Sequence, residues 1–185
     1  METKRVMNVL CYYVLPILII SLSFIFTNFR YFNLTGRIAE VLLILILFVK
    51  PVAILTNRLF LRKFLAYRRQ LGVLIFWLTL IHTIGFIYLF KMFKFSDFLG
   101  FKNHAFWGML ATIGMIVLGI TSNKFSLLLL KQNWKKLQYL AYPVLFATLL
   151  HIGIVSNEMR LFYILTTTFT ILKILEFIKR NKQKT

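Results

Sequence analysis

Cysteine and acidic residues are scarce in this sequence. The chain has one cysteine, Cys11, which lies inside the first apolar run. A single cysteine excludes both a disulfide framework and a Cys-x-x-Cys metal or redox site within the chain. Only five residues are acidic, and the loop carboxylates Asp97 and Glu158 have no neighbouring acidic partner in the sequence. We therefore expect no carboxylate pair for acid–base catalysis and no catalytic side chain.

The motifs of soluble redox enzymes are also missing. The sequence contains no dinucleotide-binding fingerprint, and too little chain lies between its apolar runs to form a flavin domain. It has no internal repeat and no low-complexity linker. Instead, 59% of the residues are hydrophobic and 17% are aromatic. This balance is not that of a soluble globule, so lipid is expected to be the solvent of this chain.

Six apolar runs are as long as, or slightly shorter than, the roughly 20 helical residues that cross a bilayer. The sequence therefore predicts an all-α integral membrane bundle of six transmembrane helices, with a single transmembrane domain over residues 1–185. The second helix is expected to kink or end at Pro51, and the polar segment 28–37 is expected to be a turn. The short patch Phe125–Leu130 is expected to lie along the interface. The six predicted helices are approximately Met7–Thr27, Ile38–Thr56, Leu71–Phe90, Ala105–Ser122, Leu137–Val155 and Leu161–Phe177.

The basic residues are distributed unevenly between the two sides of such a bundle. The termini and the second and fourth loops hold 15 Lys and Arg residues, whereas the other three loops hold 6. The positive-inside rule then predicts that both termini are cytoplasmic. The same distribution explains the net charge of +18 without a nucleic-acid partner. Lys4 and Arg5 resemble the start of a signal peptide, but the long first run without a small-residue cleavage site predicts a retained helix.

Two histidines lie inside predicted helices, where polar groups are costly and functional by default. His82 and His151 differ in expected depth by only about 4.5 Å, at about 1.5 Å of rise per residue. On spacing alone they could ligate the two axial positions of one haem iron, with Gly85 leaving space for the macrocycle. They could equally make two ordinary interhelical hydrogen bonds. His104, at the start of the fourth helix, is expected to be an interfacial polar residue rather than a ligand.

Five segments in order resemble the ferric-reductase-like transmembrane family. Within that family, the similarity is to the haem-binding membrane subunits of bacterial periplasmic methionine sulfoxide reductase systems. It covers about residues 35–155, and the spacing of the segments is more specific than any one of them. The segments are Thr35–Arg37, Tyr67–Gly72, Ile81–Thr83, Thr121–Asn123 and Trp134–Tyr142 with its continuation to Leu150–His151.

The resemblance implies that His82 and His151 are the axial metal ligands of a b-type haem. Gln138 stands thirteen residues before His151, where the family has another histidine, so one haem rather than two is expected. Arg68 stands where the broader family has a histidine and the methionine sulfoxide reductase branch has an arginine. Arg68 and Arg69 could pair with a haem propionate, a quinone or a flavin phosphate, or could serve only as positive-inside anchors. Gln138 could bind a quinone carbonyl or cap the start of the fifth helix.

The function that this resemblance implies is membrane electron transfer. The chain would be the redox subunit of an oxidoreductase system in the bacterial inner membrane, surrounded by lipid. Its donor would be a quinol or a cytoplasmic flavin reductase, and its acceptor a periplasmic reductase such as a methionine sulfoxide reductase. The alternative is a haem-free membrane scaffold or interaction protein of the same fold. A transporter or channel is less favoured, because the helices carry few polar groups to line a path.

Overall fold

The computed structural model describes residues 2–92 and 94–183, and within them every regular element is a helix. Lys184, which belongs to the basic tail counted above, lies outside the described residues. The elements are α1 (Glu2–Val9), the π-helical η1 (Leu10–Val14), α2 (Leu15–Ile25), α3 (Phe29–Thr56), α4 (Leu59–Leu65), α5 (Arg68–Phe90), the 3-10 helix η2 (Phe95–Phe98), α6 (His104–Ile120), α7 (Lys124–Leu130), α8 (Gln132–Gln138), α9 (Ala141–Val155) and α10 (Met159–Lys182).

Five helical segments of the described chain are long and apolar enough to cross a membrane. They are Arg5–Ile25, Phe29–Thr56, Arg68–Phe90, Gln132–Val155 and Met159–Lys182. The sixth apolar helix, α6, has 17 residues, which at about 1.5 Å per residue span about 26 Å. The prediction of an all-helical multi-pass membrane bundle is thus confirmed, with α6 as a shorter sixth member.

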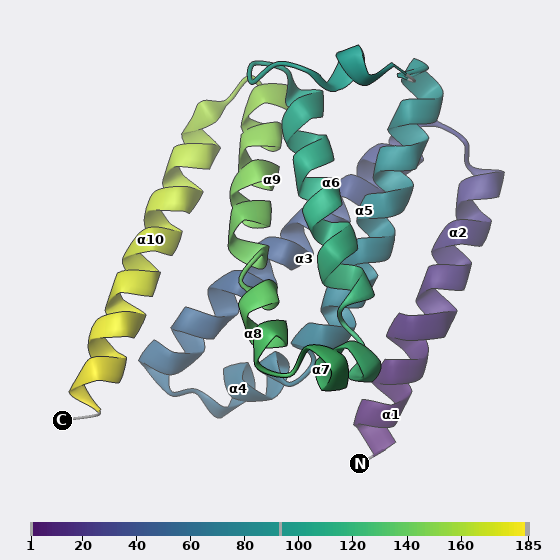
Figure 1. Cartoon of the computed structure of the whole chain (residues 1–185). Coiled ribbons are helices and arrows are strands. Elements are labelled where there is room, and N and C mark those ends of the chain that lie inside the picture. The colour runs from purple at the N-terminus through teal and green to yellow at the C-terminus, as the bar shows by residue number, and fades with distance from the viewer. Residues whose placement is uncertain (1, 93, 184–185) are drawn as a thin grey trace.

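Both described chain ends lie at the same end of the bundle (Figure 1). The short helices α4, α7 and α8 gather at this end, which we call the terminal end. The α2–α3 turn, η2 and the α9–α10 turn lie at the opposite end. This arrangement agrees with an even number of crossings. That the terminal end faces the cytoplasm stays a prediction from the distribution of basic residues.

Helix α3 begins nine residues earlier than the sequence pattern indicates. The segment 28–37, predicted as a polar turn, is helical from Phe29, because the Asn28 side chain caps the helix by accepting a hydrogen bond from Tyr31 N at 2.9 Å. Phe32 and Thr35 in this segment are buried. Pro51 lies inside α3, which continues to Thr56 rather than closing there.

The predicted fifth helix is divided into α8 and α9. A turn at Tyr139 and Leu140 separates them. Pro143 lies in the first turn of α9, and since proline has no backbone N–H it cannot donate to the Tyr139 carbonyl. The helix is interrupted at that point, and the Tyr139 carbonyl instead accepts from Tyr142 N at 3.0 Å.

Two helix pairs form the centre of the bundle. Helix α3 packs most extensively against α5, and α6 packs most extensively against α9, while α5 and α6 contact each other between the pairs. Buried side chains from both pairs, including Leu78, Met115 and Leu149, belong to one apolar core. The two candidate histidines lie on the second helix of each pair, so the packing of the pairs determines how they meet.

Candidate functional site

His82 on α5 is held against the backbone of α3. Its Nδ1 atom lies 2.8 Å from the carbonyl oxygen of Phe32. Gly36 lies one helical turn further along α3, directly beside the imidazole ring, and a Cβ atom at this position would collide with the ring. The absence of a side chain at Gly36 therefore allows the histidine to reach the helix backbone.

His151 on α9 is held against α6 in the same way. Its Nδ1 atom lies 2.8 Å from the carbonyl oxygen of His104, the first residue of α6. Gly108 lies one turn further along, and a Cβ atom there would approach Nδ1 to 2.9 Å. Glycine again leaves the space that the ring occupies.

The repeated arrangement fixes the tautomer of both rings. Phe32 and Gly36 are four residues apart, and so are His104 and Gly108. In a helix this is the spacing between a carbonyl and the N–H that donates to it, so each histidine contacts a carbonyl and the glycine that follows it by one turn. A carbonyl oxygen can only accept a hydrogen bond, so each neutral imidazole must carry its proton on Nδ1. The lone pair is then on Nε2, the nitrogen that remains to bind a metal.

The two rings lie close to each other between the helix pairs. Their centres are 6.3 Å apart and their planes are inclined by 82°. An imidazole nitrogen lies about 2 Å from a metal that it ligates, and its ring centre is roughly 1 Å further away. Two imidazoles on opposite sides of one metal therefore have centres about 6 Å apart. The observed separation fits this requirement.

The number of ligands favours a haem iron over a bare metal ion. Within residues 2–92 and 94–183, no three His, Cys, Asp or Glu side chains are grouped so that they could hold a metal ion. A structural or catalytic zinc ion needs at least three protein ligands, whereas a porphyrin supplies four nitrogens and leaves only two axial positions. A histidine pair with free Nε2 atoms is the donor set that an axially ligated haem needs.

His104 lies nearer to this pair than the sequence indicates. Its ring centre is 5.9 Å from that of His151. The backbone carbonyl of His104, and not its side chain, orients the His151 ring. The space beside Gly85, which was expected to accept the edge of a macrocycle, is filled by the ring of Phe32. This expectation was wrong, because α3 extends further towards its N-terminus than predicted.

Arg69 and Gln138 meet at a second place, the carboxyl end of α6. Arg69 Nε donates to the Ser122 carbonyl at 2.8 Å, and Gln138 Nε2 donates to Thr121 Oγ1 at 3.3 Å. Two further donors bind backbone carbonyls there: Tyr12 OH donates to Ser122 O, and Trp134 Nε1 donates to Thr121 O, both at 2.8 Å. Three segments, η1, α5 and α8, thus converge on the carboxyl end of α6.

These contacts satisfy carbonyls that have no partner within the helix. The final carbonyls of an α-helix lack intrahelical donors and carry the negative end of the helix dipole, which a guanidinium complements. Arg68, by contrast, is exposed and does not join this cluster. Thirteen residues separate Arg69 from His82 on α5, a distance of about 20 Å along the axis. The predicted site residues therefore form two groups, one near each end of the bundle.

The sequence interpretation missed the residues that position the histidines. These are the carbonyls of Phe32 and His104 together with Gly36 and Gly108. Backbone acceptors leave no residue-type signal, and the start of α3 was assigned to a turn. The two glycines are visible in the sequence, each upstream of a histidine helix, but no local pattern links them to His82 and His151.

Comparison with known proteins identifies a relative and a family. The chain is 32% identical over 108 residues to the protein-methionine-sulfoxide reductase heme-binding subunit MsrQ of Agrobacterium fabrum. The alignment covers 55% of this chain and 50% of that protein, so the chain spans about half the length of this curated relative. No solved structure matches the chain. The family described as the ferric reductase like transmembrane component matches residues 35–149, and the chain therefore belongs to this family.

Proposed function

We propose that the chain is a b-haem-binding subunit that transfers electrons across the bacterial inner membrane, with His82 and His151 as the axial ligands of one haem. The observation that carries this proposal is the pair of Nδ1 contacts to helix carbonyls at 2.8 Å. These contacts leave both Nε2 atoms unprotonated, on rings with centres 6.3 Å apart. An ordinary interhelical hydrogen bond explains each contact separately, but it does not explain why both rings meet.

A haem held at this place supplies one-electron transfer between ferric and ferrous iron. The chain's own residues orient the ligands, since each histidine is fixed by a carbonyl of a neighbouring helix and by the close approach at Gly36 or Gly108. A hydrogen bond from the outer ring nitrogen to a carbonyl sets the orientation of a ligating histidine and raises its basicity. Ile81 and Leu149, which lie next to or near the two histidines in the sequence, belong to the apolar core of the bundle.

The donor and acceptor belong to opposite ends of the bundle in this proposal. The histidines lie in the half remote from the termini, which is the periplasmic half if the termini are cytoplasmic. The relative's name refers to a protein-methionine-sulfoxide reductase, and we propose a reductase of this class as the periplasmic acceptor. The donor, a quinol or a cytoplasmic flavin reductase, would act at the terminal end. Exposed Arg68 is available there to bind an anionic group, whereas Arg69 and Gln138 are hydrogen-bonded to the end of α6.

The test is the absorbance spectrum of the purified chain and three single histidine variants. The wild-type protein should show a Soret band and the bands of low-spin haem. His82→Ala and His151→Ala should each remove one axial ligand, so that the haem is lost or becomes high-spin. His104→Ala is the matched control: it removes a neighbouring imidazole but keeps the backbone carbonyl that orients His151, so its spectrum should be unchanged.

Two results would contradict the assignment. A purified wild-type chain that binds no haem, even after reconstitution with hemin, would favour the haem-free scaffold. Unchanged low-spin spectra in both His82→Ala and His151→Ala would show that other residues ligate the iron.

A further inference from the structure

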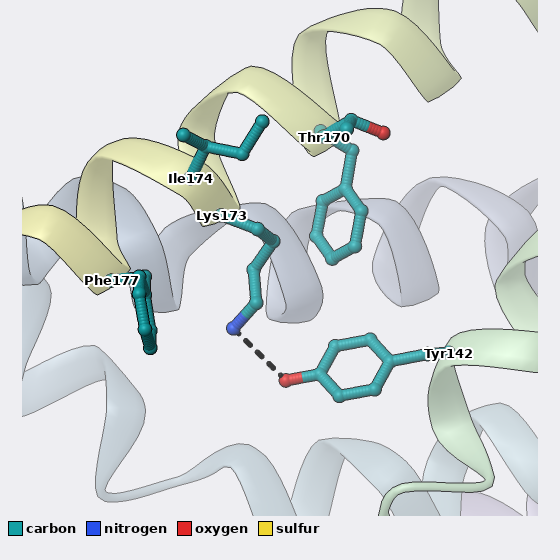
Figure 2. Close-up of a pocket in the computed structure, with 6 residues that line it drawn as sticks. Tyr142, Thr170, Lys173, Ile174 and Phe177 are labelled. Carbon is teal, nitrogen blue, oxygen red and sulfur yellow. Dashed lines mark hydrogen bonds between the residues drawn. The ribbon is translucent and has the colours of Figure 1, made fainter.

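A groove lies between α9 and α10 near the terminal end of the bundle. It has a volume of about 380 Å³ and is lined by one residue of α9 and five of α10 (Figure 2). Its walls are largely apolar, and Ile174 and Phe177 are 53% and 65% exposed on the outside of the bundle. The lining residues are Tyr142, Phe169, Thr170, Lys173, Ile174 and Phe177.

Lys173 places a cation in this apolar groove. Its ammonium group donates to the Tyr142 hydroxyl at 3.2 Å and lies 5.1 Å from the centre of that ring (Figure 2). Lys173 is nine residues from the end of α10, about 13 Å along the helix axis. Tyr142 lies in the first turn of α9. Lys173 and Tyr142 therefore lie towards the headgroup region. Of the apolar lining residues, Phe169 lies one turn further towards the hydrocarbon, whereas Phe177 lies one turn nearer the terminal end.

The cations around the groove outnumber the carboxylate that they share. Glu176, which is only 4% exposed, forms ion pairs with Lys173 at 2.8 Å and with Arg180 at 2.7 Å. Lys50 of α3 also attracts this carboxylate electrostatically. Lys173 and Arg180 are 31% and 50% exposed, so both can accept a further anionic partner. One carboxylate cannot neutralise three cations at the membrane surface, and the site retains a positive charge.

We propose that this groove binds one anionic phospholipid. The phosphate would accept hydrogen bonds from Lys173, Arg180 and the Tyr142 hydroxyl. One acyl chain would run from Ile174 along Thr170 and Phe169 towards the hydrocarbon, and Phe177 would border the groove at the headgroup end. Basic pockets between transmembrane helices are suited to lipid headgroups, since cation and phosphate attract each other strongly in a medium of low dielectric. A zwitterionic lipid offers the same phosphate but adds a cation that the site repels. The site is far from the histidine pair and does not depend on the proposed function.

The experiment measures lipid binding to the purified full chain in a non-ionic detergent by native mass spectrometry. Phosphatidylglycerol and phosphatidylcholine with identical acyl chains are added in separate titrations. Wild-type protein should retain phosphatidylglycerol about tenfold more strongly than phosphatidylcholine. Lys173→Gln should reduce this ratio to near one. Phe177→Ala, an exposed position where folding is not at risk, should weaken both lipids by shortening the groove. Inorganic phosphate should not displace the lipid if the acyl chain contributes.

The matched control is Lys102→Gln, which removes the same charge at the opposite end of the bundle. Lys102 is exposed and lies outside the groove, so the lipid preference should be unchanged. Equal retention of the two lipids by the wild-type chain would overturn the proposal. So would an equal effect of Lys173→Gln and Lys102→Gln. If Lys173→Gln fails to fold, Phe177→Ala decides: unchanged binding there would exclude the groove. Displacement by inorganic phosphate would show a simple anion site instead.

Discussion

Glycine decides how closely each histidine approaches its neighbouring helix. At Gly36 and Gly108, any side chain would occupy the space of an imidazole ring, whereas at Gly72, on the same helix as His82, a Cβ atom would meet nothing within 4 Å. The same residue type thus has two different roles on the described helices. At the first two positions it allows a contact, and at the third it only lowers helix propensity.

We predict that Gly36→Ala and Gly108→Ala displace the histidine rings. The added methyl group overlaps the ring, and relieving such overpacking costs about 1–3 kcal/mol of stability. The Nδ1 contact to the carbonyl would also lengthen, so bound haem should become partly high-spin. Thermal unfolding and the haem spectrum measure the two effects.

Gly72→Ala serves as the control for these variants. It should leave the spectrum unchanged and stabilise α5 by up to about 1 kcal/mol through helix propensity alone. Gly36→Ala and Gly108→Ala variants with wild-type stability and spectrum would show that the rings do not depend on the close approach.

At the scale of the element, the carboxyl end of α6 joins parts of the chain that are distant in sequence. Donors from η1, α5 and α8 bind the carbonyls and the hydroxyl of Thr121 and Ser122. The basic and aromatic side chains around Thr121 and Ser122 are therefore there as hydrogen-bond donors to the end of α6. The short α6 ends at this cluster and does not continue towards the headgroups.

We predict that Arg69→Gln and Arg68→Gln have different effects on stability. Arg69 donates to the carbonyl of Ser122, which is 8% exposed, and loss of a charged hydrogen bond to a buried acceptor costs about 1–3 kcal/mol. Arg68 is exposed, and its replacement should change stability by less than about 0.5 kcal/mol. Thermal unfolding in detergent compares the two. Equal losses would indicate a general charge effect at this surface rather than capping of α6.

The sequence predicted the number and order of the long helices better than their boundaries. Apolar runs of about the right length identify membrane helices, because lipid demands a continuous apolar segment. The polar residues of segment 28–37 hid the first turns of α3, where burial of Phe32 and capping by Asn28 outweigh local polarity. The break before α9 depends on Pro143, and a pattern of apolar residues does not show where a backbone N–H is missing.

The candidate site was predictable only in part for the same reason. The depth of His82 and His151 follows from helix start and rise, so their proximity could be predicted, and the structure confirms it. Their carbonyl partners could not, since α3 was expected to begin after Phe32. A contact between a side chain and a backbone carbonyl needs the position of both helices, which no local pattern contains.

At the scale of the whole molecule, both described chain ends lie at the same end of the bundle (Figure 1). We predict that this end is cytoplasmic, because most basic loop residues belong to it. Reporter fusions at the C-terminus should report the cytoplasm, and insertions in the turn 156–158 should report the outside. A fusion that is periplasmic at the C-terminus would reverse the proposed direction of electron transfer.

We also predict one haem per chain. Gln138 lacks an imidazole nitrogen, and in the described chain its amide donates to Thr121 Oγ1 at 3.3 Å, so it is a poor axial ligand. Pyridine haemochrome absorbance measured against protein concentration gives the ratio. A wild-type ratio near two would contradict the prediction. Gln138→His should raise the ratio above one if a cavity for a second haem persists at the terminal end.

The two helix pairs suggest an order of assembly. Each pair, α3 with α5 and α6 with α9, contains one histidine already oriented by its own partner helix. Each could acquire this local geometry before the pairs meet, as helices that insert first and associate later would do. A cofactor bound by both histidines would then crosslink two helix pairs that had already formed. Without it, α5 and α6 should be held together less firmly, because only side-chain packing would then join the two histidine-bearing helices.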